Sequence, residues 1–362
     1  MKKCNLCENI NQNKIFKTNF PSFRHLDFKK ISSKTKYLKC SKCQSISVYH
    51  SKKKENIENM FKSKKYSHSN QTNQKKYFNT NLLYRSEIQS EFIAKHLKDN
   101  SNILDVGCFD GRLLSFLNKK LNKSSFTGFE INKKLKKIFP KKKNFFFVEN
   151  LDNLKYQKFD AVILSHSIMY FKKLNFLLKK INYLLNEKGK LFIQIPDIVK
   201  NPLNLLMGDQ RSIITVNSMK NLCKLSGFKI IKIEKRVFKR EILFVITKNN
   251  LNVKKNLMFS DNTLENTLNF INKFKLRLIK KFLDKKYYIL GTTVNAAFVH
   301  ELFKKKILFV LDENNDKKIF RKLKVFKPKN FNFKFNTIVP LIEKKLFVKK
   351  LQKKYKHNFL LI

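Results

Sequence analysis

Four cysteines near the N-terminus form two C-x-x-C pairs, Cys4/Cys7 and Cys40/Cys43. A C-x-x-C turn presents two thiolates from one loop, and two such loops can close a tetrahedral zinc site. In a chain of 362 residues this spacing is typical of metal binding in a reducing compartment rather than of a disulfide framework. The sequence therefore predicts one zinc ion on these four cysteines and a cytoplasmic location.

A second set of candidate functional residues surrounds two glycines in ILDVGCFDGRLLSFL, residues 103–117. An apolar run contains Asp105, a turn carries Gly107 and Gly111, and an amphipathic helical pattern begins at once. A helix that starts directly after a strand points its first backbone N–H groups at a ligand. Phe109 stands where dinucleotide-binding loops usually have a further glycine. This favours a site for S-adenosylmethionine (SAM), which carries a methionyl zwitterion and no phosphate, over a pyrophosphate site.

Polar residues follow the next three apolar runs in the order that a SAM site requires. Glu130 ends the second run, where a carboxylate can accept both ribose hydroxyls of a nucleoside. Asn150, with Glu149 beside it, follows the third run and is placed for the adenine edge. A single acid after a strand is more often solvated, so the ordered set carries the prediction. We predict that SAM is held by Asp105, Gly107, Cys108, Asp110, Gly111, Glu130, Glu149, Asn150 and Ser165.

His166 follows the fourth apolar run, within FDAVILSHSIMYF. As a general base it would take a proton from the acceptor while that acceptor attacks the sulfonium methyl group. As a packing residue it would hydrogen-bond a backbone carbonyl instead. Both interpretations remain open, and we predict His166 as a catalytic residue.

The elements that must position these residues alternate between short apolar runs and amphipathic stretches. This alternation predicts the α/β fold class with a Rossmann-like, doubly wound sheet. The last two runs are close enough in sequence to form an antiparallel hairpin at one edge. A parallel sheet that ends in this way resembles the architecture of class I methyltransferases. The expected strands are Ile103–Val106, Ser125–Phe129, Phe145–Val148, Ala161–Leu164, Lys190–Ile195, Lys229–Glu234 and Ile242–Thr247.

The length of the chain exceeds what one hydrophobic core organises, so several domains are expected. A helix over 264–283 precedes a second α/β pattern, with a strand at 287–291, a helix at 294–303 and a strand at 307–311. Its turn keeps a single glycine, so a lid or a dimer surface is a better expectation there than nucleotide binding. We predict a zinc-binding module over 1–55, a helical linker over 56–100, a SAM-binding domain over 101–250 and a smaller C-terminal α/β domain over 251–362.

The net charge of +53 would ordinarily indicate a partner rich in phosphates. The charge is nearly all lysine, spread along the whole chain, whereas arginine, which binds phosphates in a bidentate manner, is scarce. Tryptophan is absent while asparagine, isoleucine and phenylalanine are abundant, which favours a compositional bias. Nucleic acid is therefore an alternative partner and not the expected one.

Hydrophobic residues make up 42% of the chain, which is enough to build cores and excludes global disorder. The N-terminus MKKCNLCENI lacks the apolar stretch of a signal peptide. The most apolar late stretch, residues 287–311, is interrupted by Asn295, His300, Glu301 and several lysines. No membrane span is therefore expected.

Nearly the whole chain resembles the sugar C-methyltransferases of deoxysugar pathways. That family joins an N-terminal zinc-binding module, a SAM-binding domain and a C-terminal α/β domain. The loop GCFDGRLL is similar to the family's Asn-Asp-Gly loop at Asp110 and Gly111, and GKLFIQIPD, residues 189–197, to its fifth strand. FKSKKYSHS, residues 61–69, resembles the family's tyrosine-serine segment, which implies substrate contacts from Tyr66 and His68.

One stretch departs from that family. Where the family has a His-rich segment after the fifth strand, this chain has LLMGDQRSI, residues 205–213. Asp209 and Gln210 are the polar residues there, and we predict Asp209 as a second catalytic candidate and Gln210 as a substrate contact. Because the histidines are missing, a hydroxyl oxygen is the expected acceptor atom.

The predicted function is SAM-dependent methyl transfer to a small polar acceptor. We expect a nucleotide-linked sugar of surface-polysaccharide or glycosylation metabolism. An RNA methyltransferase is one alternative, favoured by the zinc module and the charge but disfavoured by scarce arginine and by the absence of an Asn-Pro-Pro-Tyr-type base pocket. A non-catalytic protein that keeps the fold as a scaffold is the other.

Overall fold

The structure is a computed structural model of the chain. It divides into two compact units, which we describe separately. The first consists of Met1–Lys17, Lys36–Asn201 and Gln210–Thr263, and the second of Thr18–Thr35, Pro202–Asp209 and Leu264–Ile362. The structure describes residues 4, 6–7, 9–10, 14–24, 27, 29–50, 59, 61–62, 84–249, 261–282, 285–313, 318–341 and 345–362.

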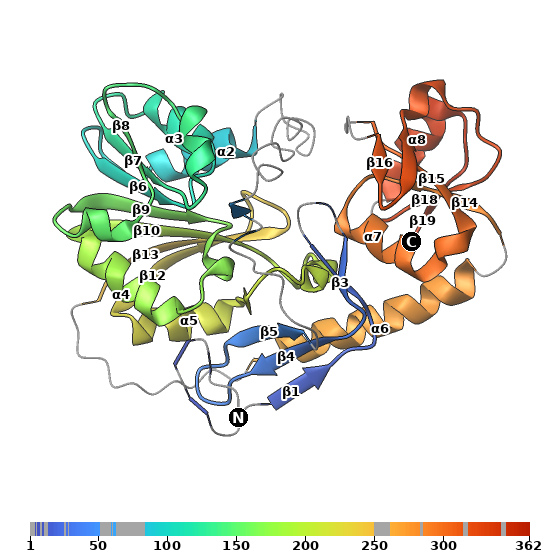
Figure 1. Cartoon of the computed structure of the whole chain (residues 1–362), viewed down its shortest axis with the longest axis horizontal. Coiled ribbons are helices and arrows are strands. Elements are labelled where there is room, and N and C mark those ends of the chain that lie inside the picture. The colour runs from blue at the N-terminus through green and yellow to red at the C-terminus, as the bar shows by residue number, and fades with distance from the viewer. Residues whose placement is uncertain are drawn as a thin grey trace. The chain divides into compact units, whose positions relative to one another are not determined.

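A seven-stranded sheet forms the centre of the first unit (Figure 1). The strand order is β12-β13-β10-β9-β6-β7-β8, and β13 runs antiparallel to both of its neighbours. The chain order reverses between β6 and β9, and in open α/β sheets ligands bind at the carboxyl ends of the strands beside such a reversal. The strands are β6 (Asn102–Val106), β7 (Ser125–Phe129), β8 (Phe145–Val148), β9 (Phe159–Ser165), β10 (Leu185–Pro196), β12 (Phe228–Glu234) and β13 (Glu241–Lys248).

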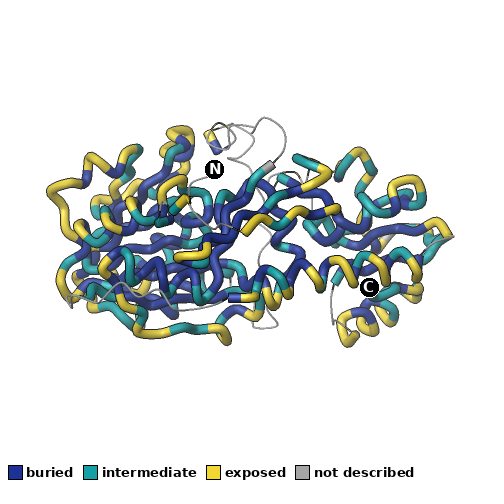
Figure 2. Tube along the Cα trace, turned by 90° about the horizontal axis from the view of Figure 1, so that it is seen from below, coloured by how far each residue is buried: buried dark blue, intermediate teal, exposed yellow. Residues whose placement is uncertain are grey.

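Helices cover both faces of this sheet, because successive strand residues alternate between two cores. Ile103 and Ile163 pack in the core that includes α2 and α3, whereas Leu104 and Leu164 pack in the core that includes α4 and α5. The central strands β6, β7, β9, β10 and β13 are mostly buried, whereas the edge strands β8 and β12 are mostly half-buried or exposed. Figure 2 shows how buried and exposed residues are distributed along the chain trace. The helices are α2 (Arg85–Ala94), α3 (Arg112–Asn118), α4 (Leu174–Leu184) and α5 (Val216–Leu225).

All seven strands predicted for this domain are present, and so is the antiparallel hairpin of the last two. The connections after β7 and β8 differ from the full helices expected among the early strands, because each contains only a short 3-10 helix, Lys133–Lys137 and Leu151–Leu154. The sequence KKLKK buries only Leu135, so it offers no apolar stripe against which a longer helix could pack.

A second sheet of the first unit carries the cysteine pairs. Its strand order is β1-β4-β5-β11, and β11 pairs antiparallel with β5 although it lies more than 150 residues further along the chain. The segment LLMGDQRSI therefore ends as a strand of the N-terminal sheet. The strands are β1 (Lys14–Lys17), β4 (Thr35–Lys39), β5 (Ile46–His50) and β11 (Ser212–Ile213).

The second unit is a smaller α/β assembly. Five parallel strands and one antiparallel edge strand follow the order β16-β17-β15-β14-β18-β19, and the small β2-β3 hairpin belongs to the same unit. The predicted strand-helix-strand pattern is confirmed in β14, α7 and β15. The elements are β2 (Ser22–Phe23), β3 (Lys30–Ser32), α6 (Thr263–Lys281), β14 (Tyr287–Leu290), α7 (Val294–Phe303), β15 (Ile307–Leu311), β16 (Ile319–Phe320), β17 (Leu323–Phe326), β18 (Thr337–Val339), α8 (Lys345–Tyr355) and β19 (Phe359–Leu361).

None of the helices in the described ranges is long and apolar enough to cross a membrane.

Candidate functional site

The loop between β6 and α3 can be formed only with glycine at two positions. Gly107 has φ +88°, and a Cβ built there would lie 2.6 Å from Cβ of Ser167. Gly111 has φ +72°, and its Cβ would lie 2.7 Å from the ring of Phe139. Side chains rarely adopt this left-handed backbone, and neither position has room for one. The loop backbone is thus held tightly against the exit of the neighbouring strand β9.

Glu130 joins this loop to the exit of β7. Its side chain is buried, and its carboxylate accepts hydrogen bonds from the backbone N–H of Phe109 at 3.2 Å and of Asn132 at 3.0 Å. Burial raises the pKa of Glu130, while the N–H groups of Asn132 and Phe109 act in the opposite direction. Phe109 has φ 52°, so the carboxylate also fixes a residue in the left-handed region.

Asp105 brings a second carboxyl group to the same place. It is 2% exposed, and its Oδ1 has no hydrogen-bond partner among the residues that the structure describes. Burial, and then the charges of Glu130 and Asp110, raise the pKa of Asp105 to about 8. Burial also raises the pKa of the Cys108 thiol well above its usual value. A buried polar atom without a partner has a high free-energy cost, which a cationic or hydrogen-bonding ligand would remove.

The other predicted SAM contacts form hydrogen bonds or ion pairs with neighbouring residues of the chain. Asp110 accepts the backbone N–H of Arg112 at 3.1 Å at the start of α3. Glu149 pairs with Lys133 at 2.7 Å, and the exposed Asn150 accepts the backbone N–H of Asp152 at 2.9 Å. The structure thus places Asp105, Glu130 and the glycine loop together, with Glu149 and Asn150 at the exit of β8, two strands from β6.

The exit of β9 carries Ser165, His166 and Ser167. Ser165 donates to Oε1 of Gln89 at 3.1 Å, and Ser167 donates to the carbonyl of Val106 at 2.5 Å. Ser167 therefore lies directly against the Gly107 turn. This neighbourhood of β6 and β9 brings the predicted donor loop and the predicted base to one edge of the sheet.

His166 has three neighbours that the sequence analysis did not identify. Its Nε2 lies 3.2 Å from Oε2 of Glu241 and contacts the guanidinium of Arg85, and its backbone N–H donates to the carbonyl of Gln194 at 3.0 Å. Arg85 forms an ion pair with Glu241, and the side-chain amide of Gln194 donates to the same carboxylate. The one feature of the sequence that could have indicated this group is the rarity of arginine in the chain, which marks Arg85.

The remaining predicted site residues lie elsewhere or cannot be placed. Asp209 and Gln210 are buried on the connection between β10 and β11, at 2% and 6% exposure. Tyr66 and His68 fall outside the described residues.

The four N-terminal cysteines converge. Their Sγ atoms all lie within 4.8 Å of one another, and the pairs Cys4–Cys43 and Cys7–Cys40 are each 3.5 Å apart. Four thiolates about 2.3 Å from a tetrahedral zinc ion would be separated by roughly 3.8 Å. Hydrogen bonding from Cys40, and then from Cys43, lowers the pKa of the Cys4 thiol well below its usual value. The donor set and its spacing fit a metal ion.

The cysteine loops are part of the core of the first unit. Cys4, Cys40 and Cys43 pack in the same hydrophobic cluster as the α4 and α5 side of the large sheet. The side-chain amide of Asn221, on α5, donates to the carbonyl of Cys43 at 3.0 Å. Any metal bound there would therefore be coupled to the packing of the sheet.

Comparison with known proteins identifies the type of domain to which the large sheet belongs. Residues 79–233 match the family model described as "Methyltransferase domain". The chain carries a class I SAM-dependent methyltransferase domain. The glycine loop, Glu130 and His166 all lie inside the matched range. No curated protein sequence matches the chain.

Several solved methyltransferase structures are similar to this domain. The plantazolicin methyltransferase BpumL in complex with a monoazolic desmethylPZN analog and SAH is 15% identical, with a TM-score of 0.39, and covers 46% of this chain and 82% of that one. CalO1, a methyltransferase in calicheamicin biosynthesis in its SAH-bound form, is 11% identical (TM-score 0.39; 45% and 54% covered). The CcbJ methyltransferase from Streptomyces caelestis is 12% identical (TM-score 0.40; 45% and 89% covered).

Proposed function

We propose that this methyltransferase transfers the methyl group of SAM to a hydroxyl oxygen of a nucleotide-linked sugar in surface-polysaccharide or glycosylation metabolism. The observation that carries the proposal is the meeting of the glycine loop, two buried carboxyl groups and His166 at the β6–β9 edge. Such an edge can hold a cationic nucleoside donor beside a base.

The residues that would hold SAM follow from their surroundings. Glu130 is fixed by two backbone N–H groups and can accept the ribose hydroxyls with its remaining lone pairs. Oδ1 of Asp105 has no hydrogen-bond partner within the described part of the chain, and a cationic group beside it would stabilise the ionised carboxylate and lower its pKa from about 8. When bound, SAM supplies a sulfonium methyl group that a nucleophile can attack directly, with the thioether sulfur as the leaving group.

The chain's own contribution to transfer is alignment and removal of one proton. Holding the acceptor oxygen in line with the methyl group supplies much of the rate. His166 lies at the exit of β9, beside the loop, where a base for that oxygen is needed. Asp209 is the second candidate base, but its burial leaves it less accessible to an acceptor than His166, whose side chain is 27% exposed.

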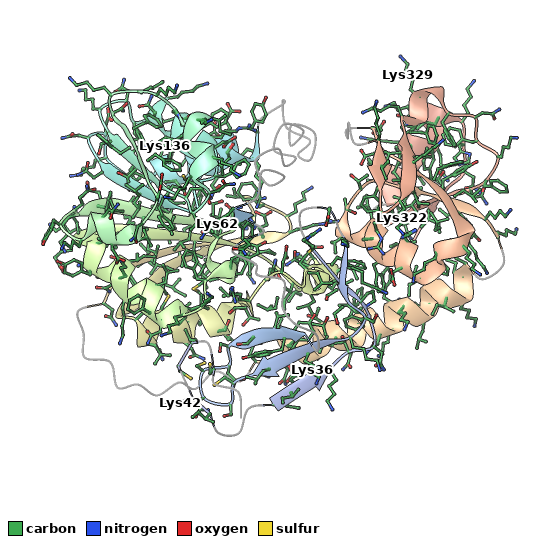
Figure 3. All side chains as sticks on the ribbon, viewed as in Figure 1. Lys36, Lys42, Lys62, Lys136, Lys322 and Lys329 are labelled. Carbon is green, nitrogen blue, oxygen red and sulfur yellow. The ribbon has the colours of Figure 1, made fainter. Side chains whose placement is uncertain are left out.

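The distribution of lysine supports a small acceptor over RNA. Exposed lysines project from separate parts of the first unit, such as Lys42, Lys62 and Lys136, and also from the second unit, as at Lys322 and Lys329 (Figure 3). A nucleic-acid track would concentrate basic side chains along one stripe. The resemblance of nearly the whole chain to the sugar C-methyltransferases supports the sugar acceptor.

We also propose that Cys4, Cys7, Cys40 and Cys43 hold a structural zinc ion. Four buried or half-buried thiols at nearly tetrahedral spacing, joined by no other ligand type among the described residues, form the closed donor set of a structural site. Thiolate sites of this kind persist where thiols stay reduced, which supports a cytoplasmic location.

Turnover separates the proposed acceptor from RNA. Purified protein is incubated with SAM labelled in its methyl group, at physiological salt, with a panel of nucleotide-linked sugars or with bulk RNA. We expect label in the sugar nucleotides and none above background in RNA. Binding alone decides nothing, because a lysine-rich surface retains RNA at low salt under either hypothesis. Labelled RNA that no sugar nucleotide competes away would contradict the proposal and favour an RNA methyltransferase.

Calorimetry with SAM tests the role of Glu130. Glu130→Ala removes the carboxylate and leaves two ribose hydroxyls unpaired, so SAM affinity should fall by roughly 1–3 kcal/mol, or about 5- to 150-fold. Asp152→Ala is the matched control, because Asp152 is a nearby exposed acid that pairs with Lys180. A Glu130→Ala protein that is folded and binds SAM as tightly as the wild type would remove the ribose role.

A further inference from the structure

Three elements bring polar side chains to His166 from distant parts of the sequence. α2 begins at Arg85, β10 carries Gln194 near its end, and β13 begins at Glu241. Because β13 is antiparallel to β10, its first residue lies at the edge where the parallel strands end, and Glu241 is paired with Pro196. The fold therefore places a carboxylate next to the proposed base by topology alone.

Glu241 is the centre of this group. Its carboxylate faces Nε2 of His166 at 3.2 Å, forms an ion pair with Arg85 and accepts the side-chain amide of Gln194. Burial by itself would raise the pKa of Glu241, but Arg85 and then His166 outweigh burial and lower the pKa to about 2. The carboxylate is thus ionised at neutral pH.

The backbone at His166 is held in a conformation that needs support. His166 has φ 54°, a left-handed conformation that is costly for a residue with a Cβ. Its N–H still donates to the carbonyl of Gln194, which extends the β9–β10 ladder by one residue. The side chain then turns toward Glu241. Strain of this kind is kept where surrounding contacts outweigh it, and here the imidazole contacts both Glu241 and Arg85.

We propose that Glu241 is a positioning residue that accepts the Nε2 proton of His166, so that Nδ1 carries the lone pair that takes the proton of the acceptor hydroxyl. The guanidinium of Arg85, which also contacts Nε2 and can only donate, must then direct its N–H groups to Glu241. Arg85 balances the charge of Glu241. This proposal rests on the role proposed above for His166. In the transfer step, the acceptor oxygen forms a bond to the methyl carbon, the carbon–sulfur bond breaks with its electron pair on sulfur, and the hydroxyl proton moves to Nδ1. Glu241 then stabilises the imidazolium that results.

If Arg85 and Glu241 only held α2 and β13 together, their ion pair would be enough. This structural role and the proposed positioning role predict different ionisation of His166. Among the described residues, two charged groups contact the imidazole, Arg85 on α2 and Glu241 on β13, and they have opposite signs. Removing each in turn should shift the histidine pKa in opposite directions if both act on the imidazole.

NMR titration of the full-length protein with labelled histidine tests this without an acceptor. The His166 signal is assigned by its loss in His166→Asn. Glu241→Gln should lower the pKa of His166 by about one unit or more, and Arg85→Gln should raise it by a similar amount. The nitrogen shifts of the neutral ring should report a proton on Nε2 in the wild type and a loss of that preference in Glu241→Gln.

Glu187→Gln is the matched control, since Glu187 lies on the same strand as Gln194 but at its exposed opposite end, where it pairs with Lys248. It should leave the His166 titration unchanged. A His166 pKa that is equal in wild type, Glu241→Gln and Arg85→Gln would overturn the positioning role, even if His166→Asn is inactive. Shifted titrations together with full turnover by His166→Asn would instead overturn the proposed base, which separates the two failures.

Discussion

Purified protein is expected to contain one zinc ion per chain and to lose its cooperative fold when that ion is removed. The cysteine loops share a hydrophobic core with α4 and α5, and Asn221 joins α5 directly to the backbone of Cys43. A structural zinc site contributes about 10–16 kcal/mol of apparent binding free energy, which equals or exceeds the whole stability of a typical domain. Loss of the ion should therefore unfold the large sheet and not the cysteine loops alone.

Metal analysis and thermal unfolding check this expectation. Cys43→Ser should lower the zinc content and the melting temperature together. Cys223→Ala is the matched control, because Cys223 is buried in the same core and burial raises its pKa to about 12, so that it offers no thiolate to a metal. This control should keep its zinc and lose only about 1–2 kcal/mol. Less than about half an equivalent of zinc in protein purified without chelator would count against the site.

Replacing His166 should lower turnover far more than SAM affinity. Removing a general base costs about 10²- to 10⁴-fold in rate. His166→Asn is preferable to His166→Ala, because asparagine accepts the left-handed backbone at φ 54° more readily and yet cannot take a proton. We expect kcat for the labelled sugar product to fall within that range while SAM affinity stays within about twofold of the wild type.

His96→Asn provides the control for this variant. His96 follows α2, and its Nδ1 lies 2.9 Å from the carbonyl of Phe92, so it has a structural contact outside the site. Its replacement should leave kcat close to that of the wild type. A His166→Asn protein that is folded and turns over at the wild-type rate would mean that His166 is a packing residue, as the sequence equally allows.

Deuterium exchange separates oxygen from carbon as the acceptor atom. Carbon methylation beside a ketone requires a base and a group that stabilises the enolate. This chain has residues 205–213 at the place where the sugar C-methyltransferases have their His-rich segment. We therefore expect no enzyme-dependent exchange from heavy water into a keto-sugar nucleotide without SAM. Exchange at the carbon beside the ketone would show that this chemistry survives, and would favour the carbon-methylating family.

Much of the large sheet was predictable because its signals are local. The seven runs of β-branched and aromatic residues need no distant partner to be recognised, and Gly107 and Gly111 mark a turn whose left-handed backbone excludes most other residues. The short 3-10 helices were not predictable in the same way. Lysine-rich stretches such as KKLKK have good helix propensity, and it is the lack of a face to bury that limits them.

The cysteine pairs show the same division. Their spacing alone predicts convergence on a metal ion, and the structure brings all four Sγ atoms within 4.8 Å. The sequence did not indicate that residues 18–35, between the two pairs, belong to the other compact unit. It also did not indicate that β11 pairs with β5. These depend on contacts between segments that are distant in sequence.

By itself, the sequence determined the strands, the glycine loop, the acid at the exit of β7 and the cysteine pairs, because each follows from periodicity, backbone conformation or ligand spacing within a few residues. Only the tertiary structure decided what surrounds His166. Arg85 lies 81 residues before it and Glu241 lies 75 residues after it. Nothing local to either residue indicates the other. They meet because an antiparallel strand begins at the edge where the parallel strands end, and that arrangement is a property of the whole sheet.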